Sequence, residues 1–570
     1  KALSGESLDI TVKVFPSSYL KESVDLKVFK LPSGFKAQFT PLLPFLPNLT
    51  PIKVYLSSLR INVDKEVLPG IYNIGILIKI GEVEDKRYLS IRVYKEPSDE
   101  LYWTNFKKNI QRTCYTPSEV GPPLDNKWSI DLTYPLMGLA SSGNYLVAFP
   151  LGFFRRGSQG AIVNPEETIP IVSCMDTNKK ETLWEWKTDE GIQAGPDIYS
   201  GLSQALPLGG PVIYKDTIYM AGGKKIHRNQ GITEWFIFES ELKTGKEIWR
   251  YPIASTPSTP LLVTGDLIYY GTGDGHICCI DKAKKKEIWK TKLGNTVVTP
   301  PAFSSGLVYA GSFGNYRSKE DAKFDDKFYC LDAYTGFKVW SFDTGYPIIA
   351  APAVSDGYVY FGTAAIPDRL INPETNAYYD DKFYCLDAKT GKKHWEFKLE
   401  DDYQSTVSPS IFGSYVYIGT TPNTTRGASK GDKFYCLNSD LGKKIWEFDT
   451  KKDINKEQPG EGGQPPPGHG PGGGGMIRMF SLTLFPPTLS NKYLYICSDP
   501  QSPLICLDTQ KGLKIGEWKQ DEGSIILPSP IISGSSLYIS VWKEPFKSRE
   551  EREKEEKESE TKEGTIYCIR

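Results

Sequence analysis

The sequence predicts an all-β protein, and three observations lead to this fold class. First, residues 1–96 alternate apolar and polar side chains in short runs such as SVDLKVF and KRYLSIRVY, the period of half-buried strands. Second, 33 Tyr, 26 Phe, 52 Gly and 41 Pro favour strands joined by many turns. Third, one eleven-residue phrase recurs along the rest of the chain.

Length and charge limit the classes of function. A chain of 570 residues is too long for one small core, so it should contain several domains or one large repetitive one. With 68 basic and 69 acidic residues, no global field recruits nucleic acid or an anionic membrane. No run of eighteen apolar residues predicts a membrane span, and no signal-peptide pattern opens the chain. Because it begins at Lys1, we expect a removed leader or a trimmed segment. Abundant Lys, Glu and Ile with five Met would suit a thermophile.

The first ninety-six residues predict a small β-sandwich, because their alternating runs are separated by Pro, Gly and Asp turns. The segments 63–81 and 86–94 resemble the closing hairpin of immunoglobulin-like modules, which are found on many extracellular proteins. Residues 97–115 lose the alternation and are predicted to be the linker to the next domain.

The repeated phrase is clearest in DDKFYCLDAYTGFKVW (325–340) and DDKFYCLDAKTGKKHW (380–395), which are identical at thirteen of sixteen positions. These copies end at Trp340 and Trp395. Further copies end at Trp184, Trp249, Trp289 and Trp446, and a copy with two extra residues ends at Trp518. An eighth copy is split between TIYCIR at the C-terminus and NKWSIDL, which contains Trp128.

A further pair of short strands follows each Trp, so each repeat is a four-stranded unit. The Trp-to-Trp spacing varies from 40 to 72 residues, with the differences in Gly, Pro and charged stretches between strands. Eight such units, the last built from both ends, predict a closed eight-bladed β-propeller over residues 116–570.

The phrase itself is suited to a structural role. Asp332 and Asp387 begin an Asp-x-x-Thr-Gly turn in which the carboxylate binds backbone N–H groups, and Gly336 and Gly391 can take positive φ. The Trp at the end of the phrase is predicted to pack on the neighbouring blade. Loss of such a buried Trp costs about 3–5 kcal/mol.

Cys330, Asp332, Thr335, Gly336 and Trp340 resemble the tryptophan-docking pattern of quinoprotein-type propellers. That family includes alcohol and sugar dehydrogenases that use pyrroloquinoline quinone and calcium, outer-membrane assembly lipoproteins that only bind partners, and sensor domains without a cofactor. The resemblance implies a prokaryotic, extracytoplasmic protein at the cell surface, secreted or periplasmic.

Seven of the ten Cys occupy the first position of the phrase, no more than one in a blade, and cysteines in separate blades are too far apart for disulfides. Packing is the favoured role, and no CxxC predicts zinc or haem. Cys278 and Cys279 are adjacent, and the resemblance implies a comparison with the vicinal disulfide that quinoprotein alcohol dehydrogenases place against the quinone. Here the pair lies inside a predicted strand, HICCID, so packing is again favoured. The sequence leaves open whether Cys114 and Cys497 are free or form a disulfide.

Several features break the repeat and are the places where a specific function could lie. Glu239 takes the first position of the phrase in the one complete copy that lacks Cys there, and needs a partner or a shifted pKa if it is buried. The insertion 192–210 could cap one face of the propeller. Two low-complexity segments are expected to be either solvated loops or arms that dock onto a partner: the Pro/Gly segment 458–475 and the mixed-charge segment 547–564.

Other candidate sites have weaker patterns. The acids before the third strand recur between blades, which favours turn or interblade contacts over calcium binding or catalysis; they are Asp325, Asp326, Asp380 and Asp381. Asn48 and Asn423 begin glycosylation sequons. The four His show no metal-binding spacing, and no nucleophile-elbow or nucleotide-binding loop is present.

These observations predict a non-catalytic scaffold or binding protein, in which the propeller faces and long loops contact other proteins or copies of the chain. No catalytic, cofactor-binding or metal-binding residue is assigned. The alternatives are a quinoprotein dehydrogenase that oxidises an alcohol or sugar with pyrroloquinoline quinone and calcium, and a ligand-sensing ectodomain. Complete structural motifs favour the first hypothesis, because fold analogy alone is a weak argument for activity.

Overall fold

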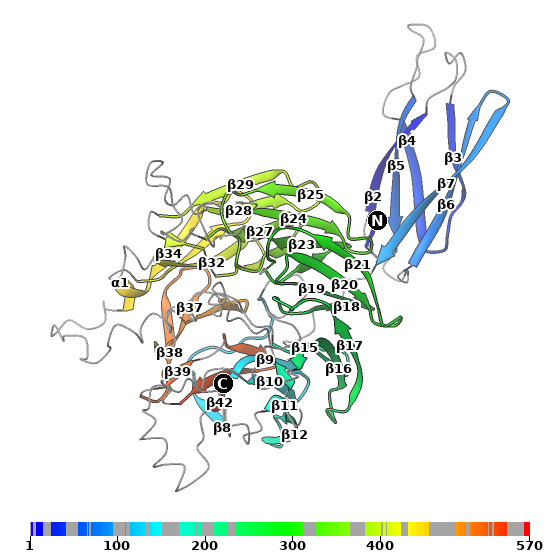
Figure 1. Cartoon of the computed structure of the whole chain (residues 1–570). Helices are drawn as coiled ribbons and strands as arrows, with labels where there is room; N and C mark the ends of the chain where they lie inside the picture. Colours follow the sequence, from blue (N-terminus) through cyan, green and yellow to red (C-terminus); the bar gives the residue numbers. More distant parts are fainter. Residues whose placement is uncertain are drawn as a thin grey trace, which may run out of the picture. The chain divides into compact units, whose positions relative to one another are not determined.

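The computed structural model describes the majority of the chain. The described residues are 2–3, 7–14, 24–41, 55–64, 67, 70–94, 109, 114–132, 136–150, 170–187, 192–194, 210–224, 234–297, 299–312, 326–364, 382–400, 403–405, 407–422, 431–454, 486–497, 502–522, 524–526, 529–543 and 564–570. They form two compact units, one of Lys1–Ser98 with Ser304–Gly306 and one of Asp99–Phe303 with Leu307–Arg570 (Figure 1). Strands dominate both units, as the sequence predicts.

The first unit contains two sheets. One has the order β1 (Ala2–Leu3), β7 (Val83–Tyr94), β6 (Gly70–Ile80) and β3 (Val24–Lys30); the other has the order β2 (Ser7–Val14), β5 (Tyr55–Val63) and β4 (Phe35–Pro41). The antiparallel β6–β7 hairpin lies within the segment expected to form a closing hairpin. Leu59, Ile61, Ile74 and Ile91 are buried in one cluster, so alternate side chains of both sheets form the core.

The second unit contains eight antiparallel sheets of four or five strands in its described residues. The first four are β9–β12 (Leu136–Ser142, Tyr145–Pro150, Pro170–Asp176, Glu181–Lys187), β13–β17 (Ile192–Ala194, Val212–Tyr214, Thr217–Lys224, Glu234–Glu241, Glu247–Ile253), β18–β21 (Leu262–Thr264, Leu267–Gly271, His276–Asp281, Lys286–Lys292) and β22–β25 (Ala302–Ser304, Leu307–Gly311, Lys327–Asp332, Lys338–Asp343). The next are β26–β29 (Ala353–Ser355, Tyr358–Gly362, Lys382–Asp387, Lys393–Lys398), β30–β34 (Tyr403–Gln404, Ser410–Phe412, Tyr415–Pro422, Lys433–Asn438, Lys444–Asp449) and β35–β38 (Thr488–Leu489, Tyr493–Ile496, Leu504–Asp508, Lys514–Trp518).

The last sheet joins the two ends of the second unit. It contains β39 (Ile525–Ile526), β40 (Ile531–Ser533), β41 (Ser536–Trp542) and β42 (Gly564–Ile569), and its outer strand is β8 (Asn126–Leu132). β42 pairs with β8 antiparallel, with Cys568 opposite Trp128. The two halves of the split repeat therefore lie in one sheet. One short helix, α1 (Thr450–Ile454), follows β34.

The sheets contact one another in sequence order. β14 contacts β9 and β18, β31 contacts β26 and β35, and β40 of the last sheet contacts β9 of the first. Neighbouring strands within each sheet run antiparallel, so the connection between the second and third strands and the exit of the fourth strand leave from the same end of the sheet.

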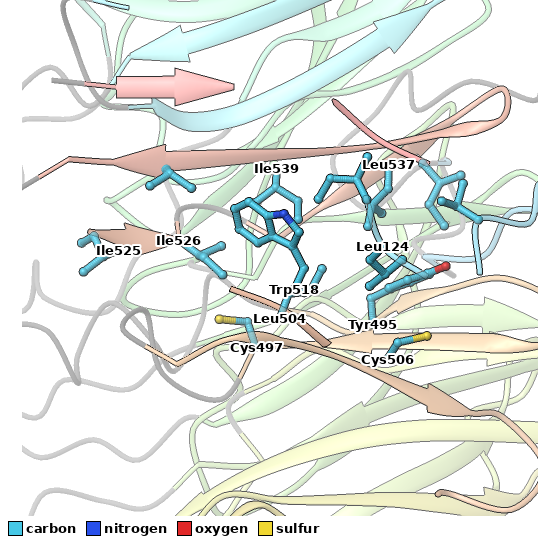
Figure 2. Close-up of a cluster of buried hydrophobic side chains, with 14 of the residues drawn as sticks. Leu124, Tyr495, Cys497, Leu504, Cys506, Trp518, Ile525, Ile526, Leu537 and Ile539 are labelled. Atoms are coloured by element: carbon cyan, nitrogen blue, oxygen red, sulfur yellow. The ribbon is translucent and has the colours of Figure 1, made fainter. Parts of the chain in front are cut away.

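Hydrophobic side chains fill the spaces between consecutive sheets. Figure 2 shows the cluster between the β35–β38 sheet and the last sheet, where Trp518 lies among Leu504, Ile526 and Ile539. Trp518 is 5% exposed, and the three aliphatic side chains are fully buried. Such interlayer packing stabilises the arrangement by roughly 25 cal/mol for each Å² of apolar surface buried.

In the described part of the chain, no helix has the length and apolar character needed to span a membrane.

Candidate functional site

A row of three side chains crosses each repeated sheet. In β22–β25, Cys330 lies directly opposite Tyr309 on one side and Trp340 on the other. Equivalent rows are Val147–Cys174–Trp184, Tyr219–Glu239–Trp249, Tyr269–Cys279–Trp289, Tyr360–Cys385–Trp395, Tyr417–Cys436–Trp446 and Tyr538–Cys568–Trp128. The row is therefore a property of the repeat, and the Tyr was not singled out from the sequence.

The two aromatic ends of the row bind the next sheet. The indole N–H of Trp340 and the hydroxyl of Tyr309 both donate to the Ala388 carbonyl, each at 3.1 Å. Other indole N–H groups donate to the corresponding carbonyls: Trp184 to Leu242, Trp289 to Ala333, Trp395 to Ser439 and Trp446 to Thr509. In these five cases the next sheet provides the acceptor.

The turn after the third strand carries this acceptor. The Asp387 carboxylate accepts hydrogen bonds from the N–H groups of Lys389 and Thr390 and from the Thr390 hydroxyl. Gly391 has φ +71°, and a Cβ there would lie 2.6 Å from Trp340 Cδ2. Asp332 and Gly336 make the same turn against Trp289. The phrase therefore shapes the surface on which the preceding Trp lies.

Trp518 departs from the pattern because of the two extra residues before it. Gly516 takes the place opposite Cys506, and Trp518 lies opposite Leu504. Its indole N–H donates to the side-chain oxygen of Asn126 at 2.8 Å, so its partner is the residue that begins β8. The contact still joins this sheet to the next one, but through a side chain.

The thiols are buried and unreactive. All ten Cys are buried thiols, Cys114 and Cys497 included. Burial raises the pKa of Cys385 and of Cys436 to about 12. A thiol is a nucleophile only as thiolate, so these groups have no nucleophilic chemistry near neutral pH.

The adjacent Cys278 and Cys279 do not fit the ring disulfide of a quinone site. Both lie on β20 and their side chains enter different cores, Cys278 with Tyr270 and Cys279 with Trp289. Burial raises the pKa of Cys278 to about 12. This pair is packing on the two faces of one strand.

Glu239 binds Tyr219 directly and is linked through it to Lys282. Its Oε1 accepts a hydrogen bond of 2.6 Å from the Tyr219 hydroxyl, and the Tyr219 oxygen accepts one of 3.1 Å from Lys282 Nζ. Lys282 belongs to the next sheet and also lies 4.3 Å from the ring centroid of Tyr214. A carboxylate–phenol–ammonium chain therefore joins these two sheets where other rows use Cys.

Burial is the largest influence on the pKa values of Lys282 and Tyr219. It lowers the pKa of Lys282, while the negative charges of Glu239 and Asp266 act in the opposite direction. Burial and the hydrogen bond to Glu239 raise the pKa of Tyr219. The phenol consequently remains a donor to Glu239 at neutral pH, and the contact is a fixed interblade link.

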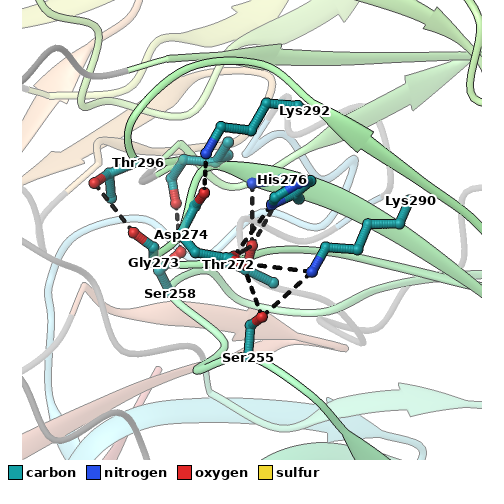
Figure 3. A network of polar contacts seen from close by, with 10 residues as sticks. Ser255, Ser258, Thr272, Gly273, Asp274, His276, Lys290, Lys292 and Thr296 are labelled. Carbon is teal, nitrogen blue, oxygen red and sulfur yellow. Dashed lines mark hydrogen bonds and ion pairs between the residues drawn. The ribbon is translucent and has the colours of Figure 1, made fainter.

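The connection between β19 and β20 is short and carries a polar network (Figure 3). Asp274 lies in this turn, and its carboxylate accepts hydrogen bonds from Thr272 and Ser255 and lies 3.4 Å from Lys290 Nζ. Burial would raise the pKa of Asp274, but the hydrogen bonds from Thr272 and Ser255, together with His276 and the charge of Lys290, outweigh it and hold that pKa well below its usual range. His276 Nδ1 lies 3.3 Å from the same carboxylate.

The structure describes only some of the other candidate residues that the sequence offers. Asp326 is buried, and its carbonyl accepts a hydrogen bond from Thr344. Asp325, Asp380, Asp381, Asn48, Asn423, 458–475 and nearly all of 547–564 lie outside the described residues. Within 192–210, residues 192–194 form β13, which pairs with β15. Among the described residues, no group of three or more His, Cys, Asp and Glu could hold a metal ion.

The family comparison agrees with the repeated sheets. A PQQ-like repeat profile, described as "Outer membrane protein assembly factor BamB", matches residues 237–323 and 322–452. These residues are PQQ-like repeats. A search of curated proteins found no significant match to the chain.

Solved structures share the fold at low sequence identity. A quinohemoprotein alcohol dehydrogenase from Comamonas testosteroni has a TM-score of 0.53 and 11% identity, over 83% of this chain and 81% of that one. Quinohemoprotein alcohol dehydrogenase ADHIIG from Pseudomonas putida HK5 has a TM-score of 0.51 and 11% identity, over 82% and 80%. BamB from Moraxella catarrhalis has a TM-score of 0.44 and 16% identity, over 78% and 99%. The β-propeller fold follows from the first two.

Proposed function

We propose that the chain is a non-catalytic, extracytoplasmic binding or scaffold protein. In this proposal, residues 116–570 form a closed eight-bladed propeller, residues 1–96 an immunoglobulin-like module and residues 97–115 the linker. The pairing of β42 with β8 and the contact of β40 with β9 support closure of the ring. The eight docking Trp and their turns then hold the blades together, and no cofactor is required for folding.

The distribution of long connections is the observation that carries this function. Six connections between second and third strands span 151–169, 225–233, 312–326, 363–381, 423–432 and 543–563. The exits of the fourth strands, from which 188–211 and 450–487 depart, lie at the same end of the sheets. The docking turns lie at the opposite end. A ring in which the strand ends that flank the long connections lie at one face is suited to recognition of a partner there.

A protein partner, or another copy of the chain, suits this face best. The segments are too long and too varied to follow the repeat, and loops on a rigid scaffold commonly provide protein-binding surfaces. The family profile carries the name of an assembly factor, which supports a protein-binding role. The dehydrogenase alternative has no matching support at Cys278 and Cys279, whose side chains face two different cores.

Two measurements test the proposal. Light scattering and crosslinking in extracts of the source organism should show a partner or a self-association that weakens when 458–475 and 547–563 are shortened to brief linkers. Shortening 365–379 serves as the matched control, since it removes another connection at the same face. Identical association in all variants would contradict the role of these two arms. Dye-linked alcohol or sugar oxidation after addition of pyrroloquinoline quinone and calcium would contradict the non-catalytic assignment.

A further inference from the structure

The docking turns are rich in lysine. They begin at the last residues of β11, β16, β20, β24, β28, β33 and β37, and their sequences are DTNKKET (176–182), ELKTGKE (241–247), DKAKKKE (281–287), DAYTGFK (332–338), DAKTGKK (387–393), NSDLGKK (438–444) and DTQKGLK (508–514). These seven turns contain sixteen Lys, ten Asp or Glu and no Arg, so their net charge is +6, whereas the whole chain has a net charge of −1. The nearly neutral chain therefore contains a local positive region.

The docking turns lie next to one another. In five of the six neighbouring pairs, the Trp that follows one turn donates its indole N–H to a carbonyl of the next turn. In the remaining pair, Lys282 of the third turn donates to Tyr219 of the preceding sheet. Each turn leaves its sheet at the end opposite the long connections. The seven turns thus form one continuous arc, which we call the docking-turn face.

The lysines of the docking-turn face are largely available to an external anion. Fourteen of the sixteen are exposed. Nine ammonium groups make no ion pair, side-chain hydrogen bond or cation–π contact with the part of the chain that the structure describes. These nine belong to Lys180, Lys243, Lys246, Lys285, Lys286, Lys389, Lys392, Lys443 and Lys511. The hairpins between first and second strands reach the same end and almost balance their own charges, with Lys215 and Lys492 against Asp216, Asp266 and Asp356.

Large apolar side chains protrude from the same turns. Phe337 is 75% exposed, Leu441 63% and Leu513 59%. In the described part of the second unit, all other exposed large apolar side chains stand one place before the Trp position of the same phrase: Ile248, Ile288, Val339, Ile445 and Ile515. The exposed large apolar side chains of this unit are therefore confined to the phrase that also carries the lysines.

The fold of the turn does not require these apolar residues. Phe337 directly follows the turn glycine, at a place that Lys392 holds in the next turn. Leu441 stands where Thr390 donates its hydroxyl to the Asp387 carboxylate, so the Leu441 turn lacks that hydrogen bond. Exposed Phe and Leu at such places add no packing within the turn, which favours a role in binding.

The combination of side chains favours a lipid surface over a protein. Protein–protein interfaces are depleted in Lys and enriched in Arg, but the docking turns have sixteen Lys and no Arg. Lys stays hydrated near anionic headgroups and is attracted to them, while Phe and Leu enter the boundary between headgroups and acyl chains. A broad lipid surface can also contact neighbouring turns of the arc together.

We propose that the docking-turn face binds the surface of an anionic lipid bilayer. The lysines attract the headgroups, and Phe337, Leu441 and Leu513 enter the headgroup boundary. The long connections leave from the opposite end of the sheets, so they face away from the bilayer and stay accessible to a partner. This inference goes beyond the proposed binding role and does not depend on it.

Vesicle flotation of the full chain tests the proposal. One set of vesicles contains phosphatidylcholine alone, and the other replaces a third of it with phosphatidylglycerol. The chain should float with the second set only, and binding should weaken as ionic strength rises from about 0.05 M to about 0.5 M, because screening shortens the range of the attraction. Equal binding to both sets, or binding to neither, would overturn the proposal.

A triple lysine variant locates the contact. Each lysine near an anionic surface strengthens binding by about fivefold, so Lys389→Gln with Lys392→Gln and Lys443→Gln should weaken it by roughly a hundredfold. The matched control changes three exposed lysines at the opposite end of the sheets, Lys292, Lys398 and Lys452, to Gln. The control should bind within about twofold of the wild type. Equal losses in the two variants would show that binding follows net charge alone and would contradict the assigned face.

A triple apolar variant tests the insertion at constant charge. Phe337→Ser, Leu441→Thr and Leu513→Ser together should weaken vesicle binding by about tenfold or more and leave the melting temperature unchanged, since all three side chains are exposed. Val83→Ser, at an exposed place in the first unit, is the control and should bind as the wild type does. Unchanged binding in the triple variant would overturn the proposal. Tight binding of duplex DNA or polyglutamate without binding to anionic vesicles would assign the face to another class of partner and overturn it as well.

Discussion

Gly391 provides the sharpest test of the contact between a docking Trp and the next turn. Gly391→Ala places a methyl group 2.6 Å from Trp340 Cδ2 and 2.7 Å from its Cε3, in a backbone with φ +71°. The left-handed backbone costs an alanine about 1–2 kcal/mol. Overpacking against the ring costs about 1–3 kcal/mol more. The free energy of unfolding should therefore fall by about 2–5 kcal/mol.

Gly345→Ala separates the two contributions. Gly345 has φ +67°, nearly the same backbone, but a Cβ there has no atom within 4 Å. Its variant should lose only about 1–2 kcal/mol. Calorimetric melting measures both, since an unfolding entropy of ~2.1 cal/mol/K for each residue, over ~470 residues, converts 1 kcal/mol to roughly 1 °C. Shifts of about 2–5 °C for Gly391→Ala and 1–2 °C for Gly345→Ala are expected. Equal shifts would refute the Trp contact as the source of the difference.

Three further predictions concern the thiols, an acid and the irregular row. A reagent for exposed thiols should react with essentially none of the ten thiols in the native protein, because every Cys is buried, and with all ten after unfolding in guanidinium. Burial would raise the pKa of Glu447, but the hydrogen bonds from Lys444 and Lys433 outweigh it and hold that pKa below 4.5. Its stabilisation is thus present above the unfolded pKa and is lost as pH falls, so the melting temperature should decline less steeply from about pH 5 to pH 3 in Glu447→Gln than in the wild type. Glu239→Cys should lower the free energy of unfolding by about 1–3 kcal/mol, because Lys282 loses the carboxylate to which Tyr219 links it. Adding Lys282→Ala should recover about 0.5–3 kcal/mol of that loss, since the double variant recreates a Tyr–Cys row with the small residue found at Ala333 and Ala388. Simple additivity of the two changes in a denaturation cycle would contradict the coupling.

The sequence was sufficient for the fold class because the phrase is repeated. Alternation and turn residues predicted strands, and the comparisons support a propeller of PQQ-like repeats. The split repeat lies in one sheet, where β42 pairs with β8, because Cys568 and Trp128 keep the spacing of the other rows. A local sequence pattern that recurs in every repeat predicts the strands and turns of each repeat without knowledge of tertiary contacts.

The partners of irregular residues could not be predicted in the same way. Glu239 was identified as a break in the pattern, but Tyr219 and Lys282 reach it from another strand and another sheet. Trp518 shifts to Asn126 because two inserted residues change its register, an outcome that depends on where the bulge forms.

Hydrogen exchange of a chain truncated after Thr561 tests most directly the claim that the two ends of the repeat region complete one blade. In the full chain, the amides of β8 (Asn126–Leu132) and β42 (Gly564–Ile569) should be protected to a similar degree, because they pair in one sheet. Removal of β42 should abolish the protection of β8 while β24 (Lys327–Asp332) retains most of its own. Unchanged protection of β8 in the truncated chain would contradict the account.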